Sequence, residues 1–506
     1  MKISQETIVQ KVKEEYGGNV RKASRELNIP RRTLRRWLTG ETVKEYKRFI
    51  VTYAQNKTPI HQGFFDALDH YIKEWDCELI CYRGKYRNPT SEQEANKEKP
   101  NWWDDKITPY LMDSNRKLNN NLVIYPARTQ PTAVNPLSGY DAHTRDKSGI
   151  FPHPKIRFKT VATHQKMAKI LTTTGAITEK NYSISKAGEK GKFHHVIGAV
   201  VVEVVDNDKF HIRHINAEAD GSFFDMAGGR CWKYTPEGIE KAKHYIDVLT
   251  MGDIQFPFID QVVYKATRDL IKRLRPIRIY LHDVIDFWRQ NHHERYNRFL
   301  KTAKAISGEA VVKDEIAETA TFLQQLANPK KYSIQIVTSN HDEALDRWLH
   351  DESLDHVGIN AEYFHWLSYN KHKSAQRVSY GFKFNNTLEF AIGEFLDLKK
   401  ANIRFIGREN TDIYNGIDYS LHGDKGANGS RGNVTSISKI GTKSVIGHTH
   451  SPAIYDGCYQ VGVKSIIPLG YAKDAPSSWM HTDCITYTNG KRTLITYIDG
   501  EYYLKS

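Results

Sequence analysis

Three short polar clusters, each directly after an apolar run of strand length, constrain the fold of this chain most strongly. The runs cover 246–251, 277–281 and 334–338, and the clusters that follow them are Gly252–Gln255, His282–Asp286 and Ser339–Asp342. In an open α/β sheet the carboxyl ends of parallel strands meet at one edge, where ligands bind. A right-handed β-α-β connection would bring Asp253 and Asp283 side by side. The spacing therefore predicts an α/β fold with its polar residues gathered at that edge.

Two later clusters complete the series, His422-Gly423-Asp424 and Gly447-His448-Thr449-His450. Alternate residues of a strand share a face, so His448 and His450 can both turn toward one metal-filled cavity. Carboxylates forced together need positive charge between them, which hard divalent cations supply. Added imidazoles and an amide oxygen tune such a site toward manganese, iron or zinc.

In this order the five clusters resemble the calcineurin-like metallophosphoesterases, whose pattern reads D-x-H, G-D-x-x-D, G-N-H-D/E, H and G-H-x-H. The resemblance covers roughly the last half of the chain. It implies a β-sandwich of four layers flanked by helices over 244–506, with two divalent metal ions. Mn²⁺ is the metal we expect, with Zn, Fe or Mg as alternatives. The implied reaction is phosphodiester hydrolysis by in-line attack of a metal-bound hydroxide.

The resemblance assigns roles by motif position. The implied metal ligands are Asp253, Gln255 and His450 at the first metal, Asn340, His422 and His448 at the second, and Asp283 bridging both. His341 would protonate the leaving oxygen or steady the transition state. Asp342 would orient His341, as a carboxylate outside the ligand set commonly does. Asp286 is interpreted as structural.

The chain departs from the family pattern at three positions. Gln255 stands where the family usually has histidine, and it would offer an amide oxygen that weakens or hardens the first metal site. His282 and Ser339 replace the usual glycines, so we expect bulkier turns there. A DNA-binding regulator with a degenerate phosphoesterase domain is therefore an alternative to an enzyme.

Residues 1–43 form a separate unit in the sequence. Apolar residues at helical spacing predict two helices, capped by Ser4 and Asn19, and a turn at 28–30 leads into a third helix over 31–38. The phrase NVRKASRELNIPRRTLRRWL resembles a helix-turn-helix of the homeodomain-like kind. The third helix would project a row of cations suited to phosphates and guanine edges: Arg31, Arg32, Arg35 and Arg36. A basic helix of a small interaction domain is the competing interpretation.

The charge balance favours a polyanionic partner. The chain has 73 Lys and Arg against 59 Asp and Glu, which leaves a net charge of +14. DNA is the partner we expect, although general binding to acidic partners would give the same balance. The five cysteines form no C-x-x-C pair and no disulfide framework, which favours a reducing cytoplasm. The sequence shows neither a long apolar run nor a signal-peptide pattern, so we expect no membrane partner.

The middle region, 44–243, predicts an α/β or α+β module of unknown role. Strands are predicted at 49–53 and 77–82 around a helix that opens at Thr58-Pro59, and a hairpin at 195–205 and 210–215. The segments 88–105 and 185–192 are predicted to be exposed loops. A polar strand face rather than a metal site is the interpretation for four histidines, His194, His195, His211 and His214.

Three further segments belong to the second half. Helical spacing over 290–329 predicts an insertion that forms a cap beside the site or an oligomer contact. The stretch 370–383 interleaves cations with Tyr380 and Phe382, which suits a nucleic-acid backbone track, with a solvated loop as the alternative. The final strands, over 459–467, 484–488 and 492–498, are expected to complete the second sheet of the sandwich.

Together these features predict a divalent-metal-dependent DNA nuclease whose N-terminal domain delivers the substrate. A phosphatase acting on protein or nucleotide substrates is a third possibility beside the enzyme and the regulator. Such a pairing of domains is typical of what a phage or mobile element encodes for processing DNA, and a homo-oligomer is compatible with it.

Overall fold

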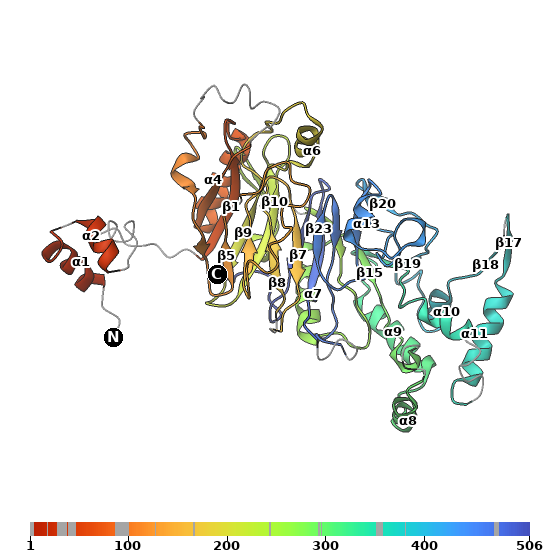
Figure 1. The fold of residues 1–506 in the computed structure, drawn as a ribbon. Coiled ribbons are helices and arrows are strands. Elements are labelled where there is room, and N and C mark those ends of the chain that lie inside the picture. Colours follow the sequence, from red (N-terminus) through yellow and green to blue (C-terminus); the bar gives the residue numbers. More distant parts are fainter. Residues whose placement is uncertain are drawn as a thin grey trace. The chain divides into compact units, whose positions relative to one another are not determined.

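The computed structural model divides the chain into two compact units, Met1–Lys47 and Arg48–Ser506 (Figure 1). The residues that the structure describes are 5–17, 19–27, 38, 47–86, 101–126, 128–164, 167–241, 244–291, 294, 296–350, 358–379, 381–469 and 475–505. Over these residues the protein is a mixed α/β structure with several sheets. Within this part of the chain, no helix combines the length and apolar character that crossing a bilayer requires.

The first unit contains two of the predicted helices, α1 (Gln5–Glu14) and α2 (Val20–Glu26). The Asn19 side chain accepts a hydrogen bond from the Lys22 N–H at 3.1 Å, so the predicted cap of the second helix is confirmed. Val12 and Ala23 are fully buried between the two helices. Of the predicted third helix the structure describes Leu38 alone, which packs against the Val12–Ala23 core. The cations of this predicted helix lie outside the described residues: Arg31, Arg32, Arg35 and Arg36.

A six-stranded sheet carries the first three polar clusters. Its order is β19-β16-β15-β14-β25-β26, with β14 at Ile246–Thr250, β15 at Arg278–His282, β16 at Ser333–Val337, β19 at Ile403–Ile406, β25 at Thr482–Tyr487 and β26 at Arg492–Thr496. The strands β14, β15, β16 and β19 are parallel neighbours. Asp253 and Asp283 follow the ends of β14 and β15, as predicted. Because these two strands are adjacent, the predicted placement of the two residues side by side is also confirmed.

Helices connect the parallel strands and cover the sheet. They are α7 (Gln261–Leu274), α9 (Val312–Leu326), α10 (Ala344–His350), α11 (Ala361–Lys373) and α12 (Thr387–Gly393). The Asp260 carboxylate caps α7 by accepting from the N–H groups of Val262 and Val263 at 2.9 and 3.0 Å. The apolar faces of these helices and of the sheet form one large core. The predicted insertion over 290–329 contains α9 and a short, mostly exposed helix, α8 (Arg298–Ile306).

A ten-stranded sheet carries the last two polar clusters. Its order is β20-β21-β22-β24-β23-β7-β8-β6-β5-β4. The strands from the second half are β20 (Ile413–Tyr414), β21 (Ile417–Asp418), β22 (Lys443–Ile446), β23 (Ala453–Tyr455) and β24 (Cys458–Gln460), and a short helix, α13, covers Val434–Ser438. Those from the middle region are β4 (Arg116–Lys117), β5 (Leu122–Ile124), β6 (Ser148–Ile150), β7 (Phe158–Val161) and β8 (Lys169–Thr172).

The last two strands do not join this sheet, so the expectation that they complete it is wrong. Instead β25 pairs antiparallel with β14, and β26 pairs with β25. The predicted hairpin turn at Asn489-Gly490 is present, and Gly490 has a left-handed φ of 74°. In the ten-stranded sheet β24 lies between β22 and β23. β23 in turn pairs with β7 of the middle region.

A third sheet lies in the middle region, in the order β10-β9-β1-β2-β3. Its strands are β1 (Arg48–Gln55), β2 (Cys77–Gly84), β3 (Leu111–Met112), β9 (Gly198–Val204) and β10 (Phe210–Asn216), and helix α4 (Gln62–Trp75) connects β1 to β2. The parallel pair β1–β2 confirms the predicted β-α-β start, and the antiparallel pair β9–β10 confirms the predicted hairpin. Three further strands form a small sheet, β11 (Phe223–Asp225), β12 (Trp232–Thr235) and β13 (Gly238–Glu240).

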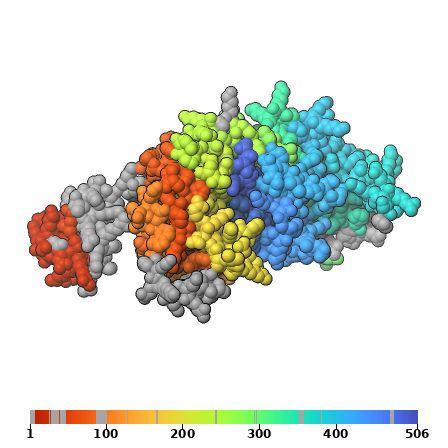
Figure 2. All heavy atoms as spheres, turned by 90° about the horizontal axis from the view of Figure 1, so that it is seen from above, coloured from red at the N-terminus to blue at the C-terminus, as the bar shows by residue number. Residues whose placement is uncertain are grey.

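The middle region and the second half pack as one unit. Figure 2 shows the orange and yellow residues of the middle region lying against the blue C-terminal residues, in agreement with the β7–β23 pairing. A buried ion cluster contributes to this packing, because Glu203 accepts hydrogen bonds from both Arg213 and the backbone N–H of Leu504, each at 2.9 Å. Such a cluster makes the last residues of the chain part of the middle region's core.

The predicted loop at 185–192 is instead a helix, α6 (Lys186–His194). The Ser185 hydroxyl caps it by accepting from the Gly188 N–H at 3.1 Å. A Cβ atom at Gly188 would lie 2.0 Å from the Ser183 carbonyl oxygen, and one at Gly191 would lie 2.7 Å from the Tyr182 ring. The glycines therefore serve close packing in a helix, whereas the sequence predicted an exposed loop. Of the other predicted loop, 101–105 is described and contains no helix or strand.

Three of the four middle-region histidines are buried, so they do not form the polar strand face that was predicted. His195, His211 and His214 are each less than 5% exposed. His214 Nε2 lies 3.0 Å from both the Thr172 hydroxyl and the Thr173 carbonyl oxygen. In the described part of this region no metal-ligand cluster includes these residues.

The buried histidines should make the protein less stable in acid. Burial lowers the pKa of His214 to about 4, whereas a histidine in an unfolded chain has a pKa of about 6.5. As the pH falls, the unfolded state binds this proton first, so His214 should reduce stability by about 1.4 kcal/mol per pH unit between those two values. In His214→Gln, the pH dependence of the urea unfolding midpoint should become shallower in this window. The exposed His372→Gln is the control, and an unchanged slope in His214→Gln would contradict the prediction.

Candidate metal centre

Two buried carboxylates meet at the edge of the six-stranded sheet. Asp253 follows β14, Asp283 follows β15, and both are at most 1% exposed. Together with His450 they offer ligand atoms that all lie within 4.8 Å of one another. Asp253 Oδ2 accepts from the His448 N–H at 2.8 Å, but Asp253 Oδ1 and both Asp283 oxygens have no hydrogen-bond partner among the described residues. Burial and the nearby Asp283 carboxylate raise the pKa of Asp253 well above its usual range.

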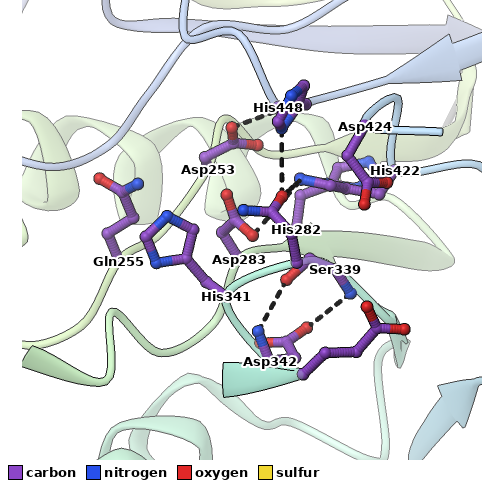
Figure 3. Close-up of polar contacts among 12 residues, drawn as sticks. Asp253, Gln255, His282, Asp283, Ser339, His341, Asp342, His422, Asp424 and His448 are labelled. Atoms are coloured by element: carbon purple, nitrogen blue, oxygen red, sulfur yellow. Dashed lines mark hydrogen bonds and ion pairs between the residues drawn. The ribbon is translucent and has the colours of Figure 1, made fainter. Parts of the chain in front are cut away.

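Three predicted ligands of a second metal converge beside Asp283. His422 Nε2 and His448 Nδ1 each lie 3.1 Å from Asn340 Oδ1, and His422 Nε2 lies 3.4 Å from Asp283 Oδ1. Figure 3 shows His422 and His448 turned toward the same space as Asp283. Burial lowers the pKa of both imidazoles, so they are neutral at pH 7. The neutral imidazole is the form that binds a metal.

The first-metal side contains His450 and Gln255. His450 Nε2 lies 3.3 Å from Asp253 Oδ2, and burial lowers the pKa of His450 to about 3. Gln255 differs from its expected role as an oxygen ligand. Its amide nitrogen lies 3.1 Å from His450 Nε2, while its oxygen accepts from the Ser465 hydroxyl at 3.2 Å. The Ser465 hydroxyl thus orients the amide so that its nitrogen faces the imidazole.

The backbone around the centre adopts conformations that side-chain-bearing residues rarely take. Gln255, Asp283, His448 and His450 all have positive φ values, between 45° and 82°. Such residues cost about 1–3 kcal/mol each and cluster at functional sites. Gly447 allows a close approach instead, because a Cβ atom there would lie 2.2 Å from Asp253 Oδ1. This contact gives the glycine of the G-H-x-H sequence a steric reason.

A buried ion pair holds the loop that carries Asp253. Lys464 Nζ donates to Asp483 Oδ2 at 2.8 Å, and both side chains are fully buried. The other Asp483 oxygen accepts from the Gly252 N–H at 2.9 Å, and the Asp253 carbonyl accepts from the Lys464 N–H at 2.7 Å. The pairing of β25 with β14 brings Asp483 to this place. Sequence reasoning missed both residues, because neither belongs to a local motif.

The ring of His341 is held by Asp286, not by Asp342 as predicted. His341 Nδ1 lies 3.1 Å from the Asp286 carbonyl oxygen and 3.8 Å from its carboxylate. Asp342 instead closes its own turn: its carboxylate accepts from the Ser339 N–H at 3.2 Å, and its N–H donates to the Ser339 hydroxyl at 3.1 Å. This reciprocal pair also gives Ser339 a function at the position where the metallophosphoesterase pattern has glycine. Burial opposes protonation of His341, but Asp283 and Asp286 outweigh it and raise the pKa of His341.

Three more residues surround the centre without having been predicted as part of it. His282 is fully buried, and its Nδ1 lies 3.4 Å from His422 Nδ1. Asp424 accepts two hydrogen bonds from the Arg408 guanidinium, at 2.6 and 2.8 Å, and Arg408 also binds Glu343. The departure from glycine at His282 was a signal in the sequence. No local signal in the sequence identified Arg408, because only tertiary packing brings this residue close to the centre.

The second unit is thus a mixed α/β protein with a buried centre of carboxylates, imidazoles and an amide at the meeting of two sheets. Over 476 residues the chain is 32% identical to Protein A1 of Escherichia phage T5, with 91% of this chain and 84% of that protein covered. The chain belongs to the same family as Protein A1. A phage relative agrees with the phage-like character expected from the sequence. No protein-family model matches the chain, and no solved structure matches it.

The centre should bind a divalent cation, because its carboxylates are buried without donors. Added MnCl₂ should raise the melting temperature of the full chain. At a free Mn²⁺ concentration 100 times Kd, the free energy of unfolding should increase by about 2.7 kcal/mol. In Asp283→Asn this increase should be largely lost, while the metal-free variant should be more stable than the wild type because the buried repulsion is gone. The control is Asp260→Asn, in which asparagine still caps α7. An equal Mn²⁺ effect in Asp283→Asn would contradict the assignment.

Proposed function

We propose that this protein is a divalent-metal-dependent DNA nuclease, and that its catalytic fold is the metallophosphoesterase β-sandwich. The observation that carries the proposal is the convergence of six side chains from separate strand ends: Asp253, Asp283, Asn340, His422, His448 and His450. Asp253, Asp283 and Asn340 follow strands β14, β15 and β16 of the six-stranded sheet. His422 follows β21 of the ten-stranded sheet, and the G-H-x-H residues follow its strand β22. A site built between the ends of two sheets supports the sandwich.

The donor set fits two cations that share Asp283. On one side Asp253 and His450 would be the ligands, and on the other Asn340, His422 and His448. The oxygens without hydrogen-bond donors and the neutral imidazoles are the physical reason for this fit. When bound, such cations supply Lewis-acid polarisation of a phosphoryl oxygen and a low-pKa water at neutral pH.

His341 is the group that we assign to the leaving oxygen. Its Nδ1 faces the Asp286 carbonyl, which leaves Nε2 for the substrate. Its side chain is 21% exposed, so a phosphodiester can reach it, while the centre itself is buried. The Asp286 carboxylate and carbonyl beside this imidazole raise its pKa, together with Asp283. A proton held at Nε2 can pass to the departing alkoxide.

DNA is the substrate that we assign on grounds of charge. The net charge of +14 attracts polyanions over a long range, and the N-terminal unit carries the sequence that resembles a helix-turn-helix. Cytoplasmic action on DNA fits the five free cysteines, four of which are buried.

A regulator with a degenerate centre is the second candidate, and one observation favours it. Gln255 turns an amide nitrogen, which is no metal ligand, toward His450. If this nitrogen blocks the first metal, the protein would bind DNA without cutting it. A phosphatase of protein or nucleotide substrates would use the same centre on a phosphomonoester.

Nuclease activity is tested with plasmid DNA and bis-p-nitrophenyl phosphate in the presence of Mn²⁺. The wild type should cleave both, and Asp283→Asn should cleave neither. His341→Ala should keep Mn²⁺ binding but lower kcat by about 10²–10⁴-fold, the usual contribution of a general acid. Asp260→Asn again serves as control. Turnover of p-nitrophenyl phosphate without turnover of the diester would favour the phosphatase, and intact DNA with a gel shift would favour the regulator.

The substitution Gln255→His separates a working centre from a degenerate one. It replaces the amide with the imidazole that the family usually has, so it should tighten Mn²⁺ binding in calorimetry. If the wild type is an enzyme, Gln255→His should change its metal preference while both proteins cleave DNA. Cleavage by Gln255→His alone would show that Gln255 has inactivated the centre.

A further inference from the structure

A short hairpin outside the two large sheets exposes an unusual set of side chains. It consists of β17 (Gln376–Val378) and β18 (Gly381–Lys383), and every residue of both strands is exposed. Figure 1 shows the hairpin projecting beyond the end of α11. Its exposed apolar side chains include Phe382 at 68%, Val378 at 47% and, just after β18, Phe384 at 42%. Tyr380, which the sequence placed in this stretch, lies outside the described residues.

The two faces of the hairpin differ. Arg377 pairs with Phe382 across the strands, so the two side chains share a face. Phe384 follows β18, and its ring centre lies 6.0 Å from Lys371 Nζ on α11. Lys383 lies on the opposite face, where its Nζ is 2.7 Å from Glu409 Oε1. One face therefore carries the Lys383–Glu409 ion pair, and the other presents the Arg377 guanidinium beside the Phe382 ring.

The electrostatics of the segment suit a polyanion. Residues 363–388 contain four Lys and Arg and no Asp or Glu; of the four, Lys371 pairs with Asp346 and Lys383 with Glu409. Arg377 is exposed and has no ion-pair partner among the described residues. Lys373, on the last turn of α11, is exposed and lies 5.9 Å from the ring centre of Tyr369, which is itself 63% exposed. Exposed cations interleaved with exposed rings are the combination that binds single-stranded nucleic acid.

The base of the hairpin is attached to the rim of the metal centre. The Asn386 amide donates to the Thr338 hydroxyl at 3.2 Å, and Thr338 leads directly into Ser339-Asn340. On the other side, Glu409, the partner of Lys383, follows Arg408 in the chain, and Arg408 binds Asp424 next to the centre. A strand bound along the hairpin would therefore be continuous with the edge where the ligands converge.

We propose that the β17–β18 hairpin binds an unpaired DNA strand and leads it to the metal centre, with Phe382 stacking on a base and Arg377 contacting the adjacent phosphate. This inference rests on the proposed nuclease function and names its substrate as single-stranded DNA. Bases within a duplex are already stacked on each other, so a side chain such as Phe382 finds an open ring face only in a single strand. Charge complementarity argues against a protein partner, because phosphates match a segment that has cations and no acids.

The test compares full-length variants by fluorescence anisotropy with a labelled single-stranded oligonucleotide and with its duplex, in EDTA so that nothing is cut. Arg377→Ala/Phe382→Ala should bind the single strand roughly tenfold more weakly, in line with the loss of one stacked base, and the duplex within about twofold of wild type. Arg298→Ala/Phe299→Ala removes the same residue types from exposed positions on α8 and should change neither. Arg377→Lys/Phe382→Trp should restore most of the single-strand binding.

The alternatives give different results. Unchanged single-strand binding in Arg377→Ala/Phe382→Ala would overturn the inference, and so would an equal loss for single strand and duplex, which would show general attraction to polyanions. With Mn²⁺ present, the variant should raise KM for a single-stranded substrate and leave turnover of bis-p-nitrophenyl phosphate unchanged. If the wild type cleaves no diester, the nuclease proposal fails while the binding result still decides the role of the hairpin.

Discussion

The repulsion between two buried carboxylates is the constraint on which this structure depends. Asp253 and Asp283 follow adjacent parallel strands and are at most 1% exposed, and three of their four oxygens meet no hydrogen-bond donor among the described residues. Burying charge without a partner is so costly that a protein normally pairs it or neutralises it. The rest of the fold keeps the two groups in place, through left-handed backbone at Asp283, the missing side chain at Gly447 and the Lys464–Asp483 pair beneath the loop.

The centre also explains why two sheets from distant parts of the chain end at the same place. The six-stranded sheet supplies the carboxylates and Asn340, whereas the ten-stranded sheet supplies His422, His448 and His450. Neither sheet by itself contributes all six of the converging side chains. The middle region extends the ten-stranded sheet through the β7–β23 pair, so its folding is coupled to the placement of the imidazoles. Binding of a cation by this site, as proposed, would stabilise the contact between the two sheets in addition to supporting catalysis.

The sequence was informative where the signal is local and silent where it depends on distant pairing. Apolar runs followed by polar residues located the ends of β14, β15 and β16, because strand length and edge chemistry are local properties. The pairing of β25 with β14 was not predictable, since no periodicity records which strands become neighbours. The reversal of roles between Asp286 and Asp342 has the same origin, because the turn of β15 brings a carbonyl to His341 from 55 residues away. Gln255 was identified by its position, but its orientation depends on Ser465.

The distribution of charge around the centre gives the strongest physical reason to expect a cation there. Several acids near this edge have a basic partner: Asp424 and Glu343 share Arg408, and Asp483 has Lys464. Each of those pairs compensates its own buried or half-buried charge. Asp253 and Asp283 have no Lys or Arg partner among the described residues. Burial lowers the pKa of His422 and His450 beside them, and His341 is the neighbouring imidazole whose pKa Asp283 and Asp286 raise. A divalent cation, as proposed above, would supply the compensating positive charge, and carboxylates, imidazoles and an amide form a donor set that suits manganese, iron or zinc.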